Sequence, residues 1–177
     1  MDRVTMFGNI AHGVVENVER SLRFIMDNHK EPVRSLAEHA GSGIEYLEVL
    51  IKRDYPSKYT NECLRSLIEI GMCGHQLVNG INDVNGLANE MTDLYARKNS
   101  DYGNSFEKSM DKFGLVVSAI RMGDKVNRLQ SLVTNKSEAQ VKDESIADTF
   151  MDLACYAIMS VMWYNYKQVE ESKQNQE

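Results

Sequence analysis

Three carboxylates recur at every fourth residue near the start of the last predicted helix: Glu144, Asp148 and Asp152. At about 100° per residue, this spacing places them on one helical face. Like charges four residues apart destabilise an exposed helix by roughly 0.2–0.5 kcal/mol per pair, so such a row requires a cation nearby. Beyond Asp152 the sequence is apolar nearly all round, which indicates that the helix enters a core. The row therefore predicts either a Mg²⁺ site or Arg and Lys partners.

The preceding predicted helix carries a mostly basic row: Arg121, Asp124, Lys125 and Arg128. Their i, i+3, i+4, i+7 spacing also defines one face. The two rows can simply neutralise each other across neighbouring helices. Alternatively, the two rows can have different roles, in which the carboxylates bind a metal ion and the Arg and Lys side chains bind phosphate oxygens. The residues alone leave both interpretations open.

A third polar group lies upstream and comprises Lys98, Asp101, Tyr102 and Asn104. The Asp-Tyr-Gly-Asn sequence is typical of a turn, and residues 99–104 are predicted to form one. An aromatic ring on a polar turn can stack on a base, and a nearby lysine can bind phosphate. Together the three groups favour a functional site over simple helix packing.

Composition limits the class of protein. The chain has 177 residues, of which 42% are apolar and 26% are charged, as in ordinary soluble globular proteins. Only two prolines, together with ten methionines, favour an all-α fold. We expect a multi-helix bundle with an N-terminal helical extension. The net charge of −6 and the pI of about 5.3 argue against binding to a DNA or RNA polymer, which needs a basic surface. A small nucleotide in a local basic pocket is still compatible with this charge.

The sequence carries no pattern for zinc binding, secretion or membrane attachment. Cys63, Cys73 and Cys155 are odd in number and lack CxxC spacing, and the histidines are scattered, so no zinc site is predicted. There is no secretory leader and no apolar run of about 18 residues. We therefore expect a cytoplasmic protein with no membrane partner.

Helical periodicity accounts for the whole chain. The predicted helices cover residues 9–29, 33–40, 44–53, 61–78, 87–98, 105–113, 115–132 and 143 to about 166. The Asn- and Gly-rich stretch 79–89 is predicted to separate an N-terminal helical region (1–85), used for packing or oligomerisation, from the domain that bears the polar groups (86–177).

Residues 35–53 have the outline of a helix-turn-helix, with a break predicted at the glycines Gly41 and Gly43. The would-be recognition helix carries Glu45 and Glu48, which would repel DNA phosphates. A hairpin used for packing or oligomerisation is the better interpretation.

The combined motifs resemble a known family. K-x-x-DYGN, then FG, R-x-x-DK-x-x-RL and DES-x-x-D-x-x-x-DL-x-x-YA are similar to the helical nucleotide modification associated domain of the first type, found largely in bacteriophage genomes. The resemblance covers about residues 90–163. The arrangement is more distantly similar to the all-α NTP pyrophosphatases (MazG-type enzymes and dimeric dUTPases), which hold Mg²⁺ with an ExxE and an ExxD pair.

The resemblance implies roles for particular acids. Glu144 and Asp148 would stand for the second acidic pair, although their spacing is ExxxD. Glu90 and Asp93 give ExxD where the family of pyrophosphatases has ExxE. These departures affect hydrolysis more than nucleotide binding.

Two functions follow from the resemblance. The first is a Mg²⁺-dependent nucleotide pyrophosphohydrolase, with Glu144 and Asp148 as catalytic residues and Asp124 and Asp152 completing the metal ligands. The second is a non-catalytic sponge that needs no cofactor and sequesters the cyclic-oligonucleotide signals of bacterial immunity. Whether the protein is an enzyme is thus left open.

Both functions use the same predicted nucleotide-binding residues: Lys98, Asp101, Tyr102, Asn104, Arg121, Lys125 and Arg128. The resemblance also implies a homo-oligomer, either a dimer or a tetramer, acting on a nucleotide or a cyclic dinucleotide. If the chain is encoded by a phage, it acts in the host cytoplasm.

Overall fold

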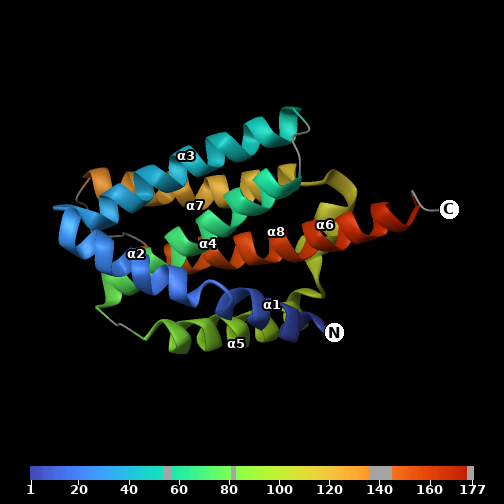
Figure 1. Ribbon diagram of the computed structural model, residues 1–177, viewed down its shortest axis with the longest axis horizontal. Coiled ribbons are helices and arrows are strands. Elements are labelled where there is room, and N and C mark those ends of the chain that lie inside the picture. Colours follow the sequence, from blue (N-terminus) through green and yellow to red (C-terminus); the bar gives the residue numbers. More distant parts are fainter. Residues whose placement is uncertain (54–56, 81–82, 136–144, 175–177) are drawn as a thin grey trace.

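The chain folds into a bundle of helices (Figure 1). The computed structural model describes residues 1–53, 57–80, 83–135 and 145–174. Within these ranges all regular secondary structure is helical, which confirms the predicted all-α fold. The helices are α1 (Arg3–His12), α2 (Val15–Asn28), α3 (Pro32–Arg53), α4 (Ser57–Asn79), α5 (Val84–Tyr102), α6 (Ser105–Phe113), α7 (Val116–Asn135) and α8 (Ile146–Gln174).

The long helix α8 lies at the centre of the bundle and packs most extensively against α4 (Figure 1). On one side of this pair, α3 packs against both α4 and α7. On the other side, α1 packs along α5, and α2 packs against α4. The short helix α6 connects the end of α5 to α7 and contacts α8. Helix α8 is therefore in contact with α1, α4, α5, α6 and α7, and these contacts place its polar residues beside the other candidate groups.

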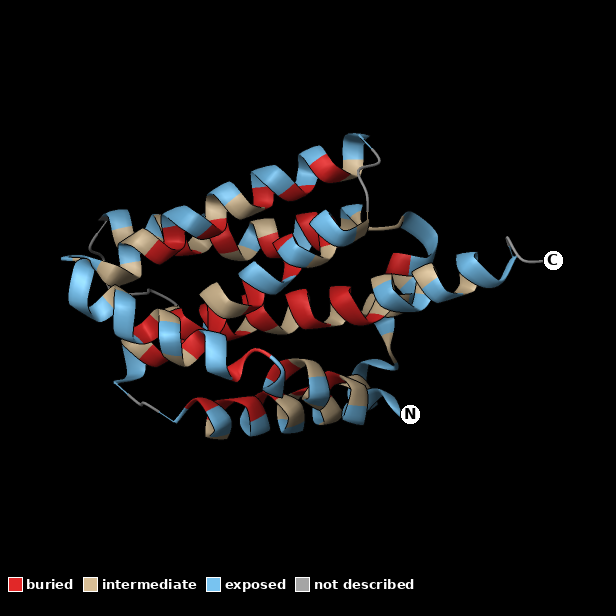
Figure 2. Ribbon diagram, in the orientation of Figure 1, coloured by how far each residue is buried: buried red, intermediate tan, exposed pale blue. Residues whose placement is uncertain are grey.

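Glycines on α4 allow its close contact with α8. A Cβ atom on Gly71 would lie 2.7 Å from the carbonyl oxygen of Phe150, and one on Gly74 would overlap the Phe150 ring. Phe150 itself is fully buried. Buried residues line the facing sides of both helices (Figure 2). The glycines thus exchange some intrinsic helix stability for a tight contact between helices.

The predicted break at Gly41–Gly43 is wrong, because α3 is one continuous helix. These glycines allow neighbouring helices to pack closely against α3 and do not form a turn. A Cβ atom on Gly43 would lie 2.9 Å from the Leu67 side chain on α4. The outline of a helix-turn-helix, and the hairpin interpretation that replaced it, both disappear with this correction.

The predicted helix over residues 9–29 is also wrong, because it is divided into α1 and α2 at Gly13 and Val14. The amide of Gly13 donates to the carbonyl of Asn9 at 3.0 Å and closes α1. Helix α1 packs on α5, whereas α2 packs mainly on α4. A single straight helix could not bury its apolar face against both partners.

Helices from the two predicted regions share one hydrophobic core. Helix α4 of the N-terminal region packs against α8, and α3 packs against α7. The boundary between residues 1–85 and 86–177 stays a prediction, as does the homo-oligomer.

Helix α8 is long and apolar enough to cross a membrane by length and composition alone. However, 61% of its most apolar window is buried inside the bundle, as in the core helix of a soluble protein. This burial accounts for the apolar composition without a lipid environment.

Candidate functional site

The acidic and basic rows meet at Asp152. Its two carboxylate oxygens accept from two ammonium groups on different helices: Oδ2 lies 2.8 Å from Nζ of Lys125 on α7, and Oδ1 lies 3.4 Å from Nζ of Lys98 on α5. The Asp152 side chain is 28% exposed and that of Lys125 is 21% exposed. One residue from each of the three polar groups, Lys98, Lys125 and Asp152, thus takes part in this cluster of ion pairs.

A cleft of about 340 Å³ opens beside Asp152, between α5, α6, α7 and α8. Two cations, Lys98 and Arg121, lie on its wall. Most of the remaining wall is aromatic or apolar: Leu94, Tyr95, Tyr102, Phe106, Cys155, Tyr156 and Met159. The rings of Phe106 and Tyr156 are tilted against each other with centroids 5.4 Å apart. This composition suits a ligand that has a flat ring and an attached anionic group.

A basic recess of about 330 Å³ adjoins this cleft on α7. Its lining residues are Arg121, Asp124, Lys125, Arg128 and Tyr156. Three cations and one carboxylate give the recess a formal charge of +2, on a chain whose net charge is −6. Arg121 and Tyr156 line both spaces and therefore join them. The aromatic cleft and the cationic recess form one composite site.

Arg121 differs from the two lysines at this site. Lys98 and Lys125 both pair with Asp152, whereas Arg121 makes no ion pair or side-chain hydrogen bond within the described residues. Its guanidinium carries five donors in a planar fork that suits phosphate oxygens. Arg121 is accordingly the residue best placed to receive an anionic group where the two spaces join.

Asp148 caps the start of α8. Its Oδ2 accepts from the amide of Ser145 at 3.0 Å and from the Ser145 hydroxyl at 2.7 Å, while the Asp148 amide donates to Ser145 Oγ at 3.1 Å. This reciprocal arrangement is a capping box. The hydroxyl of Ser145 is the main cause that holds the pKa of the Asp148 carboxyl below its usual value. Asp148 is ionised and exposed, and its observed partners are structural.

The predicted metal ligands can be compared with the donors that the structure describes. Glu144 lies outside the described residues, and among those described no group of three or more His, Cys, Asp or Glu side chains is arranged to hold a metal ion. Both oxygens of Asp152 accept from lysines, so a cation would have to displace an ammonium there. Asp124 lines the basic recess, where the three positive side chains would repel a metal cation. These observations disfavour Asp124 and Asp152 as Mg²⁺ ligands.

The predicted turn over residues 99–104 is shorter than expected. Helix α5 continues through Tyr102, and only Gly103 and Asn104 leave it, both in the left-handed region with φ of 56° and 59°. Glycine and asparagine tolerate this conformation better than other residues, which explains the Gly-Asn pair. Tyr102 is 70% exposed and lies at the cleft, whereas Asp101 is exposed and is not among the cleft-lining residues.

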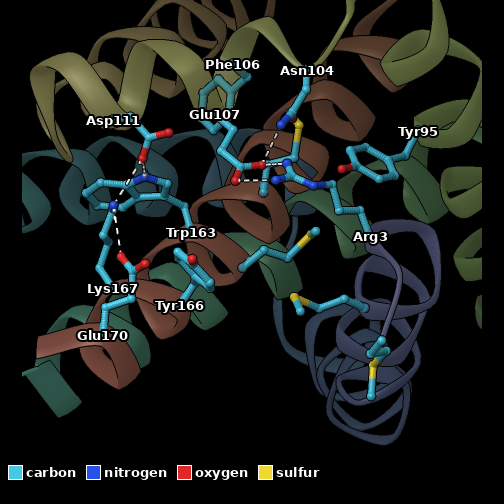
Figure 3. A pocket seen from close by; sticks show the side chains of 14 residues that line it. Arg3, Tyr95, Asn104, Phe106, Glu107, Asp111, Trp163, Tyr166, Lys167 and Glu170 are labelled. Carbon is cyan, nitrogen blue, oxygen red and sulfur yellow. Dashed lines mark hydrogen bonds and ion pairs between the residues drawn. The ribbon is translucent and has the colours of Figure 1, made fainter. Parts of the chain in front are cut away.

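Asn104 is not among the residues that line the cleft. Its Nδ2 donates to Oε2 of Glu107 at 2.7 Å, and Nη2 of Arg3 donates to the other oxygen of Glu107 at 2.7 Å. All three residues line a separate cavity between α1, α6 and α8 (Figure 3). Asn104 therefore lies at a different cavity from Lys98 and Tyr102, and its role in binding a nucleotide stays a prediction.

Several cleft residues were missed by the sequence interpretation. Tyr95, Phe106 and Tyr156 are aromatic residues of the cleft wall that the three polar groups did not include. A signal existed for Tyr156, which follows Asp152 by four residues and so lies on the same helical face. Phe106 and Tyr95 carry no such signal, because their relation to α8 depends on how α5 and α6 pack.

Residues 98–163 match the family described as nucleotide modification associated domain 1. This confirms the resemblance over a little more than a third of the chain, and the matched range contains the described residues of the acidic row, the basic row and the turn group. No curated protein and no solved structure matches the chain. The likeness to the all-α NTP pyrophosphatases stays a prediction.

Proposed function

We propose that the protein binds a nucleotide in the composite site formed by the aromatic cleft and the basic recess. The main support for this proposal is that Arg121 and Tyr156 line both spaces. A base in the aromatic cleft would therefore have its phosphates next to the cations of the basic recess. The base would stack among the aromatic side chains of the cleft. The phosphates would bind Arg121, Lys125 and Arg128 in the recess and Lys98 at its edge. The description of the matching family, associated with nucleotide modification, supports the same ligand class.

Capture without hydrolysis is the activity that the side chains support best. The carboxylate nearest the cations, Asp152, has both oxygens engaged by lysines, and Asp148 is engaged in capping α8. Phosphate can be bound by charge-assisted hydrogen bonds alone, without a metal ion. The resemblance to a phage family suggests sequestration of a nucleotide signal as the biological use, with a cyclic oligonucleotide as one candidate ligand.

The Mg²⁺-dependent pyrophosphohydrolase is the competing function. It is favoured by the row of acids that includes Glu144 and Asp148 within the family match. In that function the metal would polarise the phosphate and activate a water, while Lys125 and Arg128 would bind the charge that develops.

One experiment separates these functions. The protein is incubated with deoxynucleoside triphosphates, and separately with cyclic dinucleotides, in EDTA and in Mg²⁺. The nucleotides are chromatographed before and after the protein is denatured. Capture predicts depletion in EDTA and full recovery of intact ligand after denaturation. Monophosphate and pyrophosphate formed only with Mg²⁺ would establish the hydrolase, and the absence of depletion and of products would refute nucleotide binding.

A further inference from the structure

A second cavity, of about 440 Å³, lies between α1, α6 and α8 (Figure 3). Nothing in the proposed nucleotide site requires it. Its wall contains four aromatic residues: Tyr95, Phe106, Trp163 and Tyr166. Methionines complete much of the apolar surface and adapt readily to a ring: Met1, Met6, Met159 and Met162. This cavity is suited to a flat heteroaromatic group.

The side-chain charges of this cavity disfavour phosphate. Three carboxylates, Glu107, Asp111 and Glu170, outnumber the two side-chain cations Arg3 and Lys167. Both cations are already paired: Arg3 with Glu107, and Lys167 with Asp111 and Glu170 at 3.3 and 3.2 Å. A phosphate would meet carboxylates and two side-chain cations that already have carboxylate partners. An uncharged base would meet rings and carboxylate oxygens that accept from its amino groups.

The second cavity and the aromatic cleft share one wall. Tyr95, Phe106 and Met159 line both spaces. The ring of Tyr95 is held in place by Phe7 on α1, with stacked ring centroids 4.4 Å apart. The shared wall therefore includes a tyrosine ring that is stacked on a buried phenylalanine, and the two cavities are adjacent.

Helix α8 sets the spacing between the two cavities. Tyr156 lines the cleft and Trp163 lines the second cavity, seven residues further along the same helix. Seven residues are almost two turns, so both side chains lie on one helical face, about 10 Å apart along the axis. One helix face thus presents two aromatic positions, with cations beside the first and carboxylates paired with cations beside the second.

We infer that the ligand carries two bases joined through phosphate. This inference rests on the proposed nucleotide function and extends it to the ligand class. One base occupies the aromatic cleft, the phosphates bind on the Arg121 side, and the second base occupies the cavity of Trp163 and Tyr166. Linear and cyclic dinucleotides share this chemistry.

Isothermal titration with three ligands tests the inference: a deoxynucleoside monophosphate, a linear dinucleotide and a cyclic dinucleotide. At least one dinucleotide is expected to bind roughly tenfold or more tightly than the monophosphate, because a stacked base contributes a factor of this size. Trp163 is the single tryptophan of the chain, so its fluorescence reports occupancy of the second cavity. A dinucleotide should change this fluorescence at saturation, and the monophosphate should not.

A pair of exposed residues on α8 gives the matched variants. Tyr166 is 53% exposed and lines the cavity, whereas Val169 is 54% exposed and does not, so neither substitution removes core packing. Tyr166→Ala should weaken the dinucleotide by roughly tenfold and leave the monophosphate unchanged. Val169→Ala should change neither.

Equal affinity for mono- and dinucleotides, with no effect of Tyr166→Ala, would overturn the two-base ligand while leaving the proposed function intact. Failure of every nucleotide to bind would overturn both. Tight binding of only the linear or only the cyclic form would support the inference and identify the source.

Discussion

Nζ of Lys125 on α7 lies 2.8 Å from Oδ2 of Asp152 on α8, and this ion pair joins the two rows of charge that the sequence displays on separate helices. The second oxygen of Asp152 accepts from Lys98 on α5. One carboxylate thereby holds two ammonium groups beside the aromatic cleft. In the proposed site Asp152 would position the two lysines for phosphate and would also compete with the phosphate for them.

The substitution Asp152→Asn tests whether Asp152 holds the two lysines or binds a metal ion. Removal of the negative charge removes the ion pairs that Asp152 makes with Lys98 and Lys125, so the affinity for a nucleotide phosphate in EDTA is expected to stay the same or to increase. The loss of stability should be below about 1 kcal/mol, because the ion pair is partly exposed. Titration calorimetry in EDTA measures the affinity. A large loss of binding that only Mg²⁺ reveals would instead assign a metal to Asp152.

Arg121→Ala should weaken nucleotide binding by roughly 10- to 100-fold, the usual range for charge-assisted hydrogen bonds lost to a truncated guanidinium. The unfolding midpoint should not change, because Arg121 is exposed and has no ion pair in the described part of the chain. Arg97→Ala, which removes an exposed arginine of α5 outside the cleft, is the matched control. Equal effects of both substitutions would mean that only overall charge matters.

Gly71→Ala should destabilise the fold by about 1–3 kcal/mol, because the new Cβ would lie 2.7 Å from the Phe150 carbonyl oxygen at the α4–α8 contact. Gly123→Ala is the contrasting change. Its Cβ would approach nothing closer than Ile44 at 3.8 Å, so it should stabilise α7 by roughly 0.5–1 kcal/mol. Urea denaturation measures both. Similar values for the two substitutions would contradict the close approach of α4 to α8.

The Ser145–Asp148 capping box should stabilise α8 by about 1 kcal/mol. Ser145→Ala and Asp148→Ala should therefore each lower the free energy of unfolding by about this amount, and the double variant should lose little more than either. Because the folded pKa of Asp148 is depressed, its contribution is present above the usual pKa of 3.8 and is lost as the pH falls below it. Denaturation curves at pH 7 and at about pH 3 check both parts. Additive losses would show that the two side chains act separately.

His75 should make stability depend on pH near neutrality. Burial lowers the pKa of His75 from its usual value of 6.5, despite the nearby carboxylates of Glu90 and Asp148. The unfolded chain then binds a proton that the folded chain rejects, so the free energy of unfolding falls as the pH drops below 6.5. His75→Gln should flatten this slope, measured by urea denaturation between about pH 5 and 7.5. His39→Gln, at an exposed position, should preserve it.

Helical periodicity and the scarcity of proline were sufficient to predict the fold class. Spacing within single helices also predicted that Lys125 shares a face with Arg121 and Arg128, and that Asp152 shares one with Asp148, because such positions follow from 3.6 residues per turn. Ser145, three residues before Asp148, gives the capping-box pattern, which can be recognised in the sequence. Glycine misled the prediction at Gly41–Gly43, since a glycine used for close helix contact and a glycine used for a turn look alike in one sequence.

Contacts between distant segments could not be predicted. The Arg3–Glu107 contact spans 104 positions, and the second cavity depends on it because α1 and α6 form facing walls there. Neither residue has a motif around it. Likewise the ion pair between Lys98 and Asp152 depends on the packing of α5 against α8, which no local sequence pattern specifies.

The continuity of α8 has a further consequence for insertions and deletions. One residue added between Tyr156 and Trp163 would rotate everything beyond it by about 100° and turn the indole out of its cavity. Loops elsewhere in the chain can lengthen without this effect. Any homologue that retains both ring positions must therefore retain the seven-residue interval, and a length change inside it would mark a chain that has lost one of them.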